Sequence, residues 1–411
     1  MNMLTNEEKR VLIYSTSEKP TNPSEVKSET PLESLNLNWT ERDLPERERT
    51  KHVHRLHPYL GKYIPQLVEV FLRKYFTSGQ TVLDPFVGSG TTLVQANELG
   101  INSVGFDISQ FNIAICRAKT TQYNLKQVRN EVMDALEKLS AVVPKELKQL
   151  SLWDNSSVYD TSLSLTDSKY LKTWFAPQAL FELITYKNLI LAEDYEYKDL
   201  LKVILSRSAR SARLTTHFDL DFPKKPQIEP YWCYKHSREC FPTQEAFKFI
   251  RRYSLDTLKR IEEFAQKLSN ANVNVQHGDS RDMEIPNIDG VITSPPYVGL
   301  IDYHDQHAYA FHLLGLDDQS EHEIGPASNG SSQKAQQKYL NDIAAVFRSC
   351  TNSMASGGRL IVVAGDRSNL YPKIAELAGV ETEAVLQRHV NRRTGRRSSE
   401  FFESIFIWRK K

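Results

Sequence analysis

The sequence predicts an α/β fold: a mostly parallel sheet that is interrupted by a long, α-rich insert. Short apolar runs that end in turn-forming residues are typical of strands buried on both faces of a parallel sheet. Six such runs lie at 81–86, 103–108, 273–279, 290–295, 358–366 and 404–410. A helical pattern at 91–100 separates the first two runs, and strand, helix and strand in close succession form a βαβ unit.

The segment between the second and third runs has mostly helical periodicity. In KQVRNEVMDALEKLS, residues 126–140, the apolar side chains fall on one helical face. We therefore expect three parts: a polar N-terminal extension at 1–45, a catalytic domain made of 46–117 and 271–411, and an α-rich insert at 118–270. The extension is expected to be an arm or a loosely packed segment, in which VLIY at 11–14 could dock as an edge strand.

Composition and charge indicate a globular protein with no overall preference for polyanions. The 411 residues are 40% hydrophobic and 25% charged, and the formal net charge is +1, so nucleic-acid binding must depend on local patches. Four scattered cysteines are too few for a disulfide framework, which suits a reducing compartment. The first residues lack the apolar core of a signal peptide, and no apolar run has membrane-spanning length. We expect a cytoplasmic protein with no membrane partner.

The segment LDPFVGSGTTL, 83–93, places an acid, a glycine turn and a helix start directly after a predicted strand. Its glycines let the backbone approach a ligand closely. A phosphate loop would need a lysine after Gly90, and the dinucleotide fingerprint would need a third glycine where Leu93 stands. Asp84 would repel a pyrophosphate but suits an amino group, and Asp107, at the end of the next strand, is placed to hold ribose hydroxyls. This combination indicates S-adenosylmethionine, although the GSG turn by itself would favour a tight turn with no ligand.

A second motif, TSPPY at 293–297, follows a buried strand and presents hydrogen-bond acceptors. Pro295 and Pro296 donate no N–H and hold the preceding residues extended, so the corner offers the Ser294 hydroxyl and free carbonyls. An acceptor pair suits an exocyclic amine, whose lone pair would then be directed at an electrophilic methyl group. Tyr297 would stack on a base that has left the duplex, and no strong general base is needed. The alternatives are a structural turn or a proline-rich peptide ligand.

LDPFVGSGTT, GFDIS and TSPPY together resemble the motifs of the amino-group DNA methyltransferases, specifically the cytosine-N4 branch. HPYLGKYIPQLVEVFLRKYF, 57–76, is similar to the family segment that closes over the methionine part of the cofactor. The resemblance covers about 52–110 and 273–410. It implies catalytic roles for Ser294, Pro295, Pro296 and Tyr297. It implies cofactor contacts for Tyr59, Asp84, Phe86, Gly88, Ser89, Gly90, Thr91, Asp107 and Asp279.

The resemblance also implies a seven-stranded, Rossmann-like methyltransferase sheet, with cofactor and base pockets at the carboxyl ends of the strands. Ser294 stands where adenine-N6 relatives usually carry Asp or Asn, which favours N4 of cytosine. The expected activity is methylation of double-stranded DNA with a flipped target base. Its expected setting is the protective half of a restriction-modification system, beside a cognate restriction endonuclease that acts on the same site. Adenine-N6 methylation, RNA cytosine methylation and an inactive nucleic-acid-binding protein are the alternatives.

The motif order departs from that of many small N4 enzymes, because here the cofactor motif precedes the catalytic motif. The central insert is then the expected target-recognition region. Two arginine clusters are the best candidates for DNA phosphate contacts, although charge runs are usually solvated surface. They are Arg207, Arg210 and Arg213 near one helical face, and Arg392, Arg393, Arg396 and Arg397 around a glycine.

Two groups of residues have spacings that could suit a metal. The first is Cys233, His236 and Cys240. A zinc knuckle there would need a fourth ligand, for which Cys116 and His217 are candidates, and no second C-x-x-C pair supports it, so we expect no metal. The second group, His304 and His307, follows the catalytic motif and is expected near the base pocket. The expected chemistry needs no metal.

Overall fold

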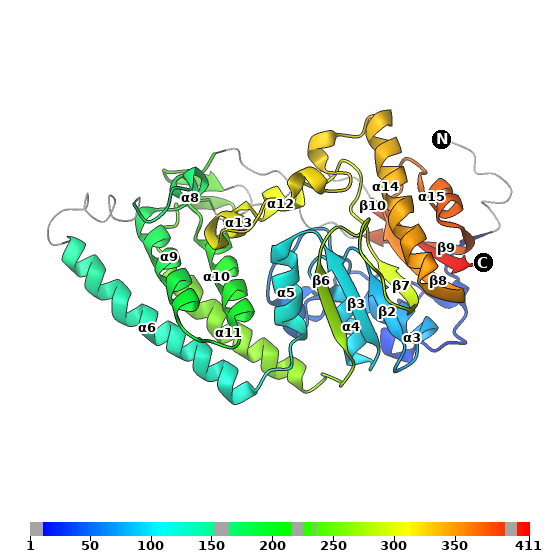
Figure 1. Cartoon of the computed structure of the whole chain (residues 1–411), viewed down its shortest axis with the longest axis horizontal. Helices are drawn as coiled ribbons and strands as arrows, with labels where there is room; N and C mark the ends of the chain where they lie inside the picture. Colours follow the sequence, from blue (N-terminus) through cyan, green and yellow to red (C-terminus); the bar gives the residue numbers. More distant parts are fainter. Residues whose placement is uncertain (1–10, 152–163, 216–224, 234–235, 391–400) are drawn as a thin grey trace.

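The computed structural model describes residues 11–151, 164–215, 225–233, 236–390 and 401–411. Figure 1 shows two halves: a sheet flanked by helices, and a helical layer formed mainly by the insert. The sheet has the strand order β1-β9-β10-β8-β7-β2-β3-β6. Its strands are β1 Leu12–Ile13, β2 Thr81–Asp84, β3 Asn102–Asp107, β6 Val273–His277, β7 Ile288–Thr293, β8 Met354–Ala364, β9 Val380–Val390 and β10 Phe401–Lys410.

The centre of the sheet is parallel, so its strands end at one edge. β2 pairs in parallel with β3 and β7, and β7 pairs in parallel with β8. The chain runs outward from β2 to β3 and β6 and then crosses to β7, so the order reverses between β2 and β7. Open α/β sheets bind ligands at such a position. β10 is antiparallel to β8 and β9, and the predicted α/β sheet of seven strands is confirmed, with the short β1 added at its edge.

Six strands occupy the runs predicted from the sequence, whereas β9 does not match any of them. Its segment, VETEAVLQRHV, alternates buried with more exposed side chains and therefore lacks a continuous apolar run. β1 confirms that VLIY docks at the sheet edge, since Leu12 pairs in parallel with Val385 and Ile13 with Leu386.

Helices cover both faces of the sheet. In this half they are α2 Glu46–Arg49, α3 Pro65–Tyr75, α4 Thr91–Glu98, α5 Gln110–Thr120, α12 Tyr303–Gln306, α13 Ala308–Leu314, α14 Gln333–Asn352 and α15 Tyr371–Ala378. α14 and α15 pack on the face that contains Val291 and Val362. α3 packs on the opposite face, with Ile292 and Ile361. Successive residues of β7 and β8 thus point to opposite faces, as strand geometry requires.

The described part of the N-terminal extension, residues 11–45, packs against the catalytic half. Leu35 and Leu37 are buried in one core with Phe71 of α3. The Trp39 indole also donates a hydrogen bond to the carbonyl of Thr21 at 2.9 Å. The expectation of a loosely packed arm is wrong for these residues, because a few apolar side chains in a polar segment are enough to cover α3.

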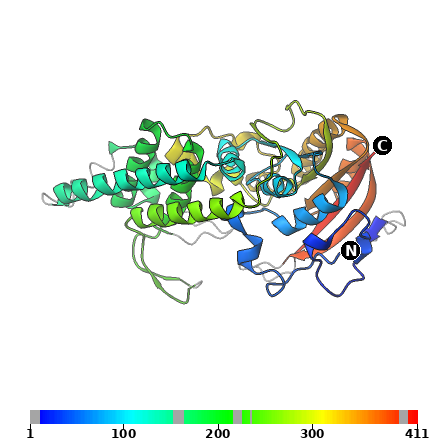
Figure 2. The ribbon, with the colours of Figure 1, turned by 90° about the horizontal axis from the view of Figure 1, so that it is seen from below.

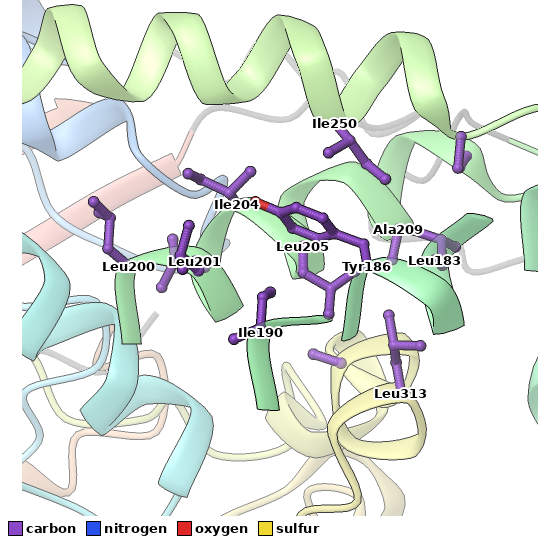
Figure 3. Close-up of a cluster of buried hydrophobic side chains, with 14 of the residues drawn as sticks. Leu183, Tyr186, Ile190, Leu200, Leu201, Ile204, Leu205, Ala209, Ile250 and Leu313 are labelled. Atoms are coloured by element: carbon purple, nitrogen blue, oxygen red, sulfur yellow. The ribbon is translucent and has the colours of Figure 1, made fainter. Parts of the chain in front are cut away.

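The insert has a hydrophobic core that continues into the catalytic half. Its elements are α6 Leu125–Ser151, α8 Lys169–Trp174, α9 Pro177–Ala192, α10 Lys198–Ala212, β4 Tyr231–Cys233, β5 Arg238–Cys240 and α11 Phe247–Ala265. Figure 3 shows Tyr186 of α9 and Leu205 of α10 packed near Leu313 of α13. Phe111 and Ile115 of α5 belong to the same core. None of the described helices is long and apolar enough to cross a membrane.

Candidate active site

A cavity of about 820 Å³, including solvent at its mouth, opens beside the carboxyl ends of β2, β3 and β7. Because the three strands end at one edge of the sheet, residues from separate sequence motifs meet there. Of the predicted site residues, the lining contains Tyr59, Phe86, Gly88, Ser89, Thr91, Asp107, Asp279, Ser294 and Pro296. Gly90 is instead the N-cap of α4, with a left-handed backbone (φ 79°) that favours glycine.

Asp84 is buried behind the cavity lining, so its expected contact with a cofactor amino group stays a prediction. Its buried carboxylate accepts hydrogen bonds from the hydroxyls of Thr92 and Thr293, each at 2.6 Å. The Tyr63 hydroxyl and the Phe86 backbone amide donate two more, each at 3.1 Å. These four donors occupy the carboxylate, so Asp84 fixes the ends of β2 and β7 and the first turn of α4.

Asp107 faces the cavity and retains acceptor capacity. One oxygen accepts from the Gly88 amide at 2.9 Å, and the other from the Ser109 amide at 2.8 Å and the Asn112 side chain at 3.0 Å. A carboxylate has about four acceptor positions, so one stays available to a ligand. Burial raises the pKa of Asp107 to about 6, although the three hydrogen bonds lower it.

The segment before α3 forms a second wall of the cavity. Tyr59 lies against the glycine loop: a Cβ atom on Gly88, which has φ 49°, would lie 3.2 Å from the Tyr59 hydroxyl oxygen. The Tyr59 ring stacks on Tyr303, with 6.1 Å between ring centroids. Lys62 also lines the cavity, and burial lowers its pKa to about 8. The loop after the catalytic motif therefore contacts the segment before α3 directly.

Ser294 and Pro296 line the cavity, whereas Pro295 and Tyr297 lie outside its lining. The Pro296 carbonyl accepts a hydrogen bond from the Tyr339 hydroxyl at 2.9 Å. This corrects the expectation that the carbonyls of this corner are all free. The Ser294 hydroxyl, which is in the lining, remains the candidate side-chain acceptor of the motif.

Tyr297 is held by a charged pair from neighbouring strands. Its hydroxyl donates to Glu403 Oε1 of β10 at 3.0 Å, and Glu403 Oε2 lies 3.6 Å from Arg388 Nε of β9. Burial raises the pKa of Tyr297 well above its ordinary value, and the charge of Glu403 raises it further. The phenol therefore stays protonated and acts as a donor. Sequence motifs do not indicate this contact, because the residues meet only through strand pairing.

Several residues that the sequence patterns do not predict complete the wall. Glu323 and Ser280 line the cavity. His304, expected near the base pocket, is in the lining and contacts Glu323 through Nδ1, while its amide donates to the same carboxylate oxygen at 2.8 Å. His307 lies outside this lining, and burial lowers its pKa to about 3. Only the proximity of Tyr303 and His304 to TSPPY could have drawn attention to this region.

Comparison with known proteins identifies the family. A family model described as a DNA methylase matches residues 2–118. The chain is 37% identical to the type II methyltransferase M.MjaII of Methanocaldococcus jannaschii, over 88% of this chain and 81% of that protein. The chain belongs to the amino-group DNA methyltransferases of the type II restriction-modification kind.

Other known proteins are less similar to this methyltransferase, in sequence or in structure. The type II methyltransferase M.BsoBI of Geobacillus stearothermophilus is 23% identical, over 72% of this chain and 59% of its own. Among solved structures, the rRNA methyltransferase aviRa of Streptomyces viridochromogenes matches 86% of this chain and 88% of its own, with a TM-score of 0.33 and 11% identity.

The methyl donor of this methyltransferase is S-adenosylmethionine, and the cavity fits it. Ser89 Oγ and Asn112 Oδ1 are buried in the lining without a hydrogen-bond partner among the described residues. Together with Asp107 they offer polar groups to ribose and methionine. Phe86 and Ile324 add apolar surface, which suits a purine ring.

Asp279 lies in the lining of the methyltransferase cavity but is bound to a neighbouring arginine. Arg281 Nε lies 2.9 Å from Asp279 Oδ1, and the Arg281 amide donates to the same oxygen at 2.9 Å. Arg281 also contacts Asp342 at 3.3 Å. The expected contact between Asp279 and the adenine stays a prediction.

Arg207 and Arg210 of α10 and Arg213, which directly follows it, differ in what they contact. Arg207 is buried and lies 2.7 Å from Asp256, and Arg213 is buried with its guanidinium 4.8 Å from the Tyr309 ring centre. Both have partners within the methyltransferase, which argues against a DNA contact of Arg207, whereas Arg213 also lines a hollow together with Arg210 and its DNA contact stays a prediction. Arg210 is partly exposed and lines a separate hollow, so it stays a candidate. The predicted contacts Arg392, Arg393, Arg396 and Arg397 lie outside the described residues.

Proposed function

We propose that this methyltransferase transfers a methyl group to N4 of cytosine in duplex DNA, as the protective half of a restriction-modification system. The observation that carries the proposal is that Ser294 lines the same cavity as Asp107 and the Gly88 loop. A base amine at Ser294 and a cofactor ribose at Asp107 would thus share one enclosed space. Serine offers an acceptor to the amine without adding a charge.

Bound S-adenosylmethionine supplies the electrophilic methyl group. The Ser294 hydroxyl, in the cavity lining, would accept one N–H bond of the amine and a backbone carbonyl of the TSPPY corner the other, which directs the nitrogen lone pair at the methyl carbon. The N–C bond forms as the C–S bond breaks, and the methylated amine then releases a proton to water. Tyr297, held by Glu403, flanks a base that has left the duplex.

The insert would supply the surface that recognises the DNA site. Reading a duplex in its grooves requires protein surface beyond the catalytic cavity. Arg210 lines a hollow together with Lys62 and Gln306, next to Tyr59 of the cavity wall. This position suits a contact with a DNA phosphate close to the flipped base.

Nucleoside mass spectrometry tests the proposal. DNA from a methylation-free host that expresses the chain should contain N4-methylcytosine, and DNA from a host that expresses Ser294→Ala should contain much less. N6-methyladenine would contradict the choice of base but keep the family. Modified cytidine in RNA, with unmodified DNA, would contradict the choice of polymer.

The protective role needs a separate measurement. Plasmid DNA from the expressing host should resist at least one nuclease in a panel of restriction endonucleases, at a site that sequencing shows to be methylated. Plasmid from the Ser294→Ala host is the matched control and should be cleaved. Methylation scattered without a defined site would argue against a cognate endonuclease.

A further inference from the structure

The insert carries a short β-hairpin that exposes large apolar side chains. β4 and β5 have three residues each. Trp232 is 57% exposed and Phe241, next to β5, is 67% exposed. Figure 2 shows this green segment projecting from the helical layer. A two-stranded hairpin of this size is marginally stable in water, so it needs an additional stabilising interaction.

Two cysteines and a histidine converge on this hairpin. Cys233 Sγ, Cys240 Sγ and a ring nitrogen of His236 all lie within 4.8 Å of one another. Cys233 pairs with Arg238, and Tyr231 pairs with Cys240, so both sulfurs belong to one face of the hairpin. The His236 amide donates to the Cys233 carbonyl at 3.1 Å, and a nitrogen of its imidazole lies close to both sulfurs.

The spacing of these atoms matches a tetrahedral zinc site. His236 Nδ1 lies 3.5 Å from Cys240 Sγ. Zinc with Zn–S bonds of about 2.3 Å and Zn–N bonds of about 2.0 Å separates its sulfur and nitrogen ligands by roughly 3.5 Å. Hydrogen bonds of the imidazole and of Cys233 with Cys240 explain these contacts pair by pair. A shared metal ion explains all three positions.

We propose that Cys233, His236 and Cys240 bind a structural Zn²⁺ ion, with a fourth position for water or another donor. Binding replaces the two thiol protons and fixes the strand register of the hairpin. None of the three residues lines the methyl-transfer cavity, so the ion stabilises the insert and takes no part in catalysis. The site is independent of which base is methylated.

A second cluster of potential ligands is a weaker candidate. His52, His54 and Glu98 also have convergent ligand atoms. Glu98 already binds the Lys51 ammonium at 2.9 Å and His52 Nε2 at 2.9 Å. A metal ion there would face the positive charge of Lys51 at close range, so we assign zinc to the hairpin.

Elemental analysis of the full chain tests the zinc site. Protein purified without a polyhistidine tag or chelator, and dialysed against Zn²⁺, should carry about one zinc per chain. Cys240→Ser should lose it, and because Cys240 is only half-buried in the projecting hairpin, the fold should survive. Cys350→Ala, a cysteine buried in the catalytic half, is the matched control and should keep the metal. Equal zinc in wild type and Cys240→Ser, or none in either, would overturn the proposal.

Cobalt substitution provides a readout that does not depend on activity. Co²⁺ in place of zinc should give the wild-type chain thiolate-to-metal charge-transfer absorption, which Cys240→Ser should weaken or abolish. Bound cobalt without thiolate absorption would place the metal elsewhere. Loss of metal in His54→Ala but not in Cys240→Ser would assign it to the second cluster and would also overturn the proposal.

Discussion

The chemistry of the site depends on single side chains whose partners come from distant parts of the chain. Asp84 holds hydroxyls from α4 and β7, and Tyr297 is held by Glu403 of β10. Such contacts fix an orientation rather than supply a reactive group. Their loss should therefore lower turnover more than it weakens cofactor binding.

Glu403→Gln should lower kcat roughly five- to tenfold, because replacing a charged acceptor by a neutral one costs about 1 kcal/mol. The KM for S-adenosylmethionine should change little, since Glu403 does not line the cavity. Steady-state kinetics with saturating DNA measure both constants. Tyr297→Phe should give a similar loss, and the double variant no further loss. A fully active Tyr297→Phe enzyme would rule out a role for this hydrogen bond.

The affinity for S-adenosylmethionine should fall as pH drops through about 6, where Asp107 gains a proton. Its pKa is raised by burial, and protonation removes the one acceptor position that Asp107 still offers to a ribose hydroxyl, so each pH unit below that value should weaken binding up to about tenfold. Isothermal titration calorimetry between pH 5 and pH 8 measures this change. Asp107→Asn should bind weakly with a flatter pH profile, and an equally steep profile in that variant would assign the titration to another group.

At the scale of elements, the N-terminal segment and α10 differ from what local sequence suggests. A segment rich in polar residues buries Leu35 and Leu37 against α3. Arg207 and Arg213, in and next to α10, are buried, because Asp256 and Tyr309 provide partners for them inside the molecule. In both cases the tertiary partner decides the role of the side chain.

Leu37→Ala should lower the free energy of unfolding by roughly 2–4 kcal/mol, the usual cost of removing a fully buried leucine side chain. Leu191→Ala, on α9, makes the same chemical change at a side chain that is 54% exposed and should cost under about 1 kcal/mol. Urea unfolding of both variants tests the difference. Equal stabilities would show that the N-terminal segment does not pack as described.

Arg207→Ala should lower the melting temperature, because it removes the buried ion pair with Asp256 at 2.7 Å and the packing of the guanidinium over the Tyr253 ring, although Arg260 still lies 3.3 Å from Asp256. Asp256 is partly exposed, so the cost should be roughly 1–3 kcal/mol rather than that of a fully buried pair.

Arg210→Ala should leave the melting temperature unchanged and weaken DNA binding at low salt, with a salt dependence reduced by about one phosphate contact. Unchanged DNA affinity in Arg210→Ala would remove this residue from the interface.

At the scale of the whole molecule, the insert and the catalytic half share one core. Phe111 and Ile115 of α5 and Leu313 of α13 are buried among the insert helices. The two halves therefore cannot be separated without exposing apolar surface on both. The insert differs in this respect from a domain joined by a flexible linker.

A chain that lacks residues 118–270 should be insoluble or unfolded, even though all three methyltransferase motifs are kept. The deletion exposes the apolar face of α5 and leaves α13 without its partners. Circular dichroism and gel filtration of the deletion variant test this expectation. A soluble, monomeric variant that still binds S-adenosylmethionine would show that the catalytic half folds independently.

Much of the architecture could be predicted because strands buried in a parallel sheet leave a local signal. Six strands, the glycine loop and TSPPY all follow from short segments, and their meeting at one sheet edge follows from parallel pairing. β9 could not be found in this way, because its side chains alternate between buried and exposed positions. Glu323 and Ser280 could not be found either, since no local pattern distinguishes a polar residue that faces a cavity.

The sequence by itself determined the fold class, the family resemblance and the place of Asp107 and Ser294, because each depends on residues that are close together in the chain. Only the tertiary structure decided that Asp84 is occupied by four donors and that Arg207 and Arg213 face inward. It also decided that Cys233, His236 and Cys240 converge. The physical reason is that hydrogen-bond partners and burial are properties of the folded neighbourhood, and residues far apart in sequence supply them.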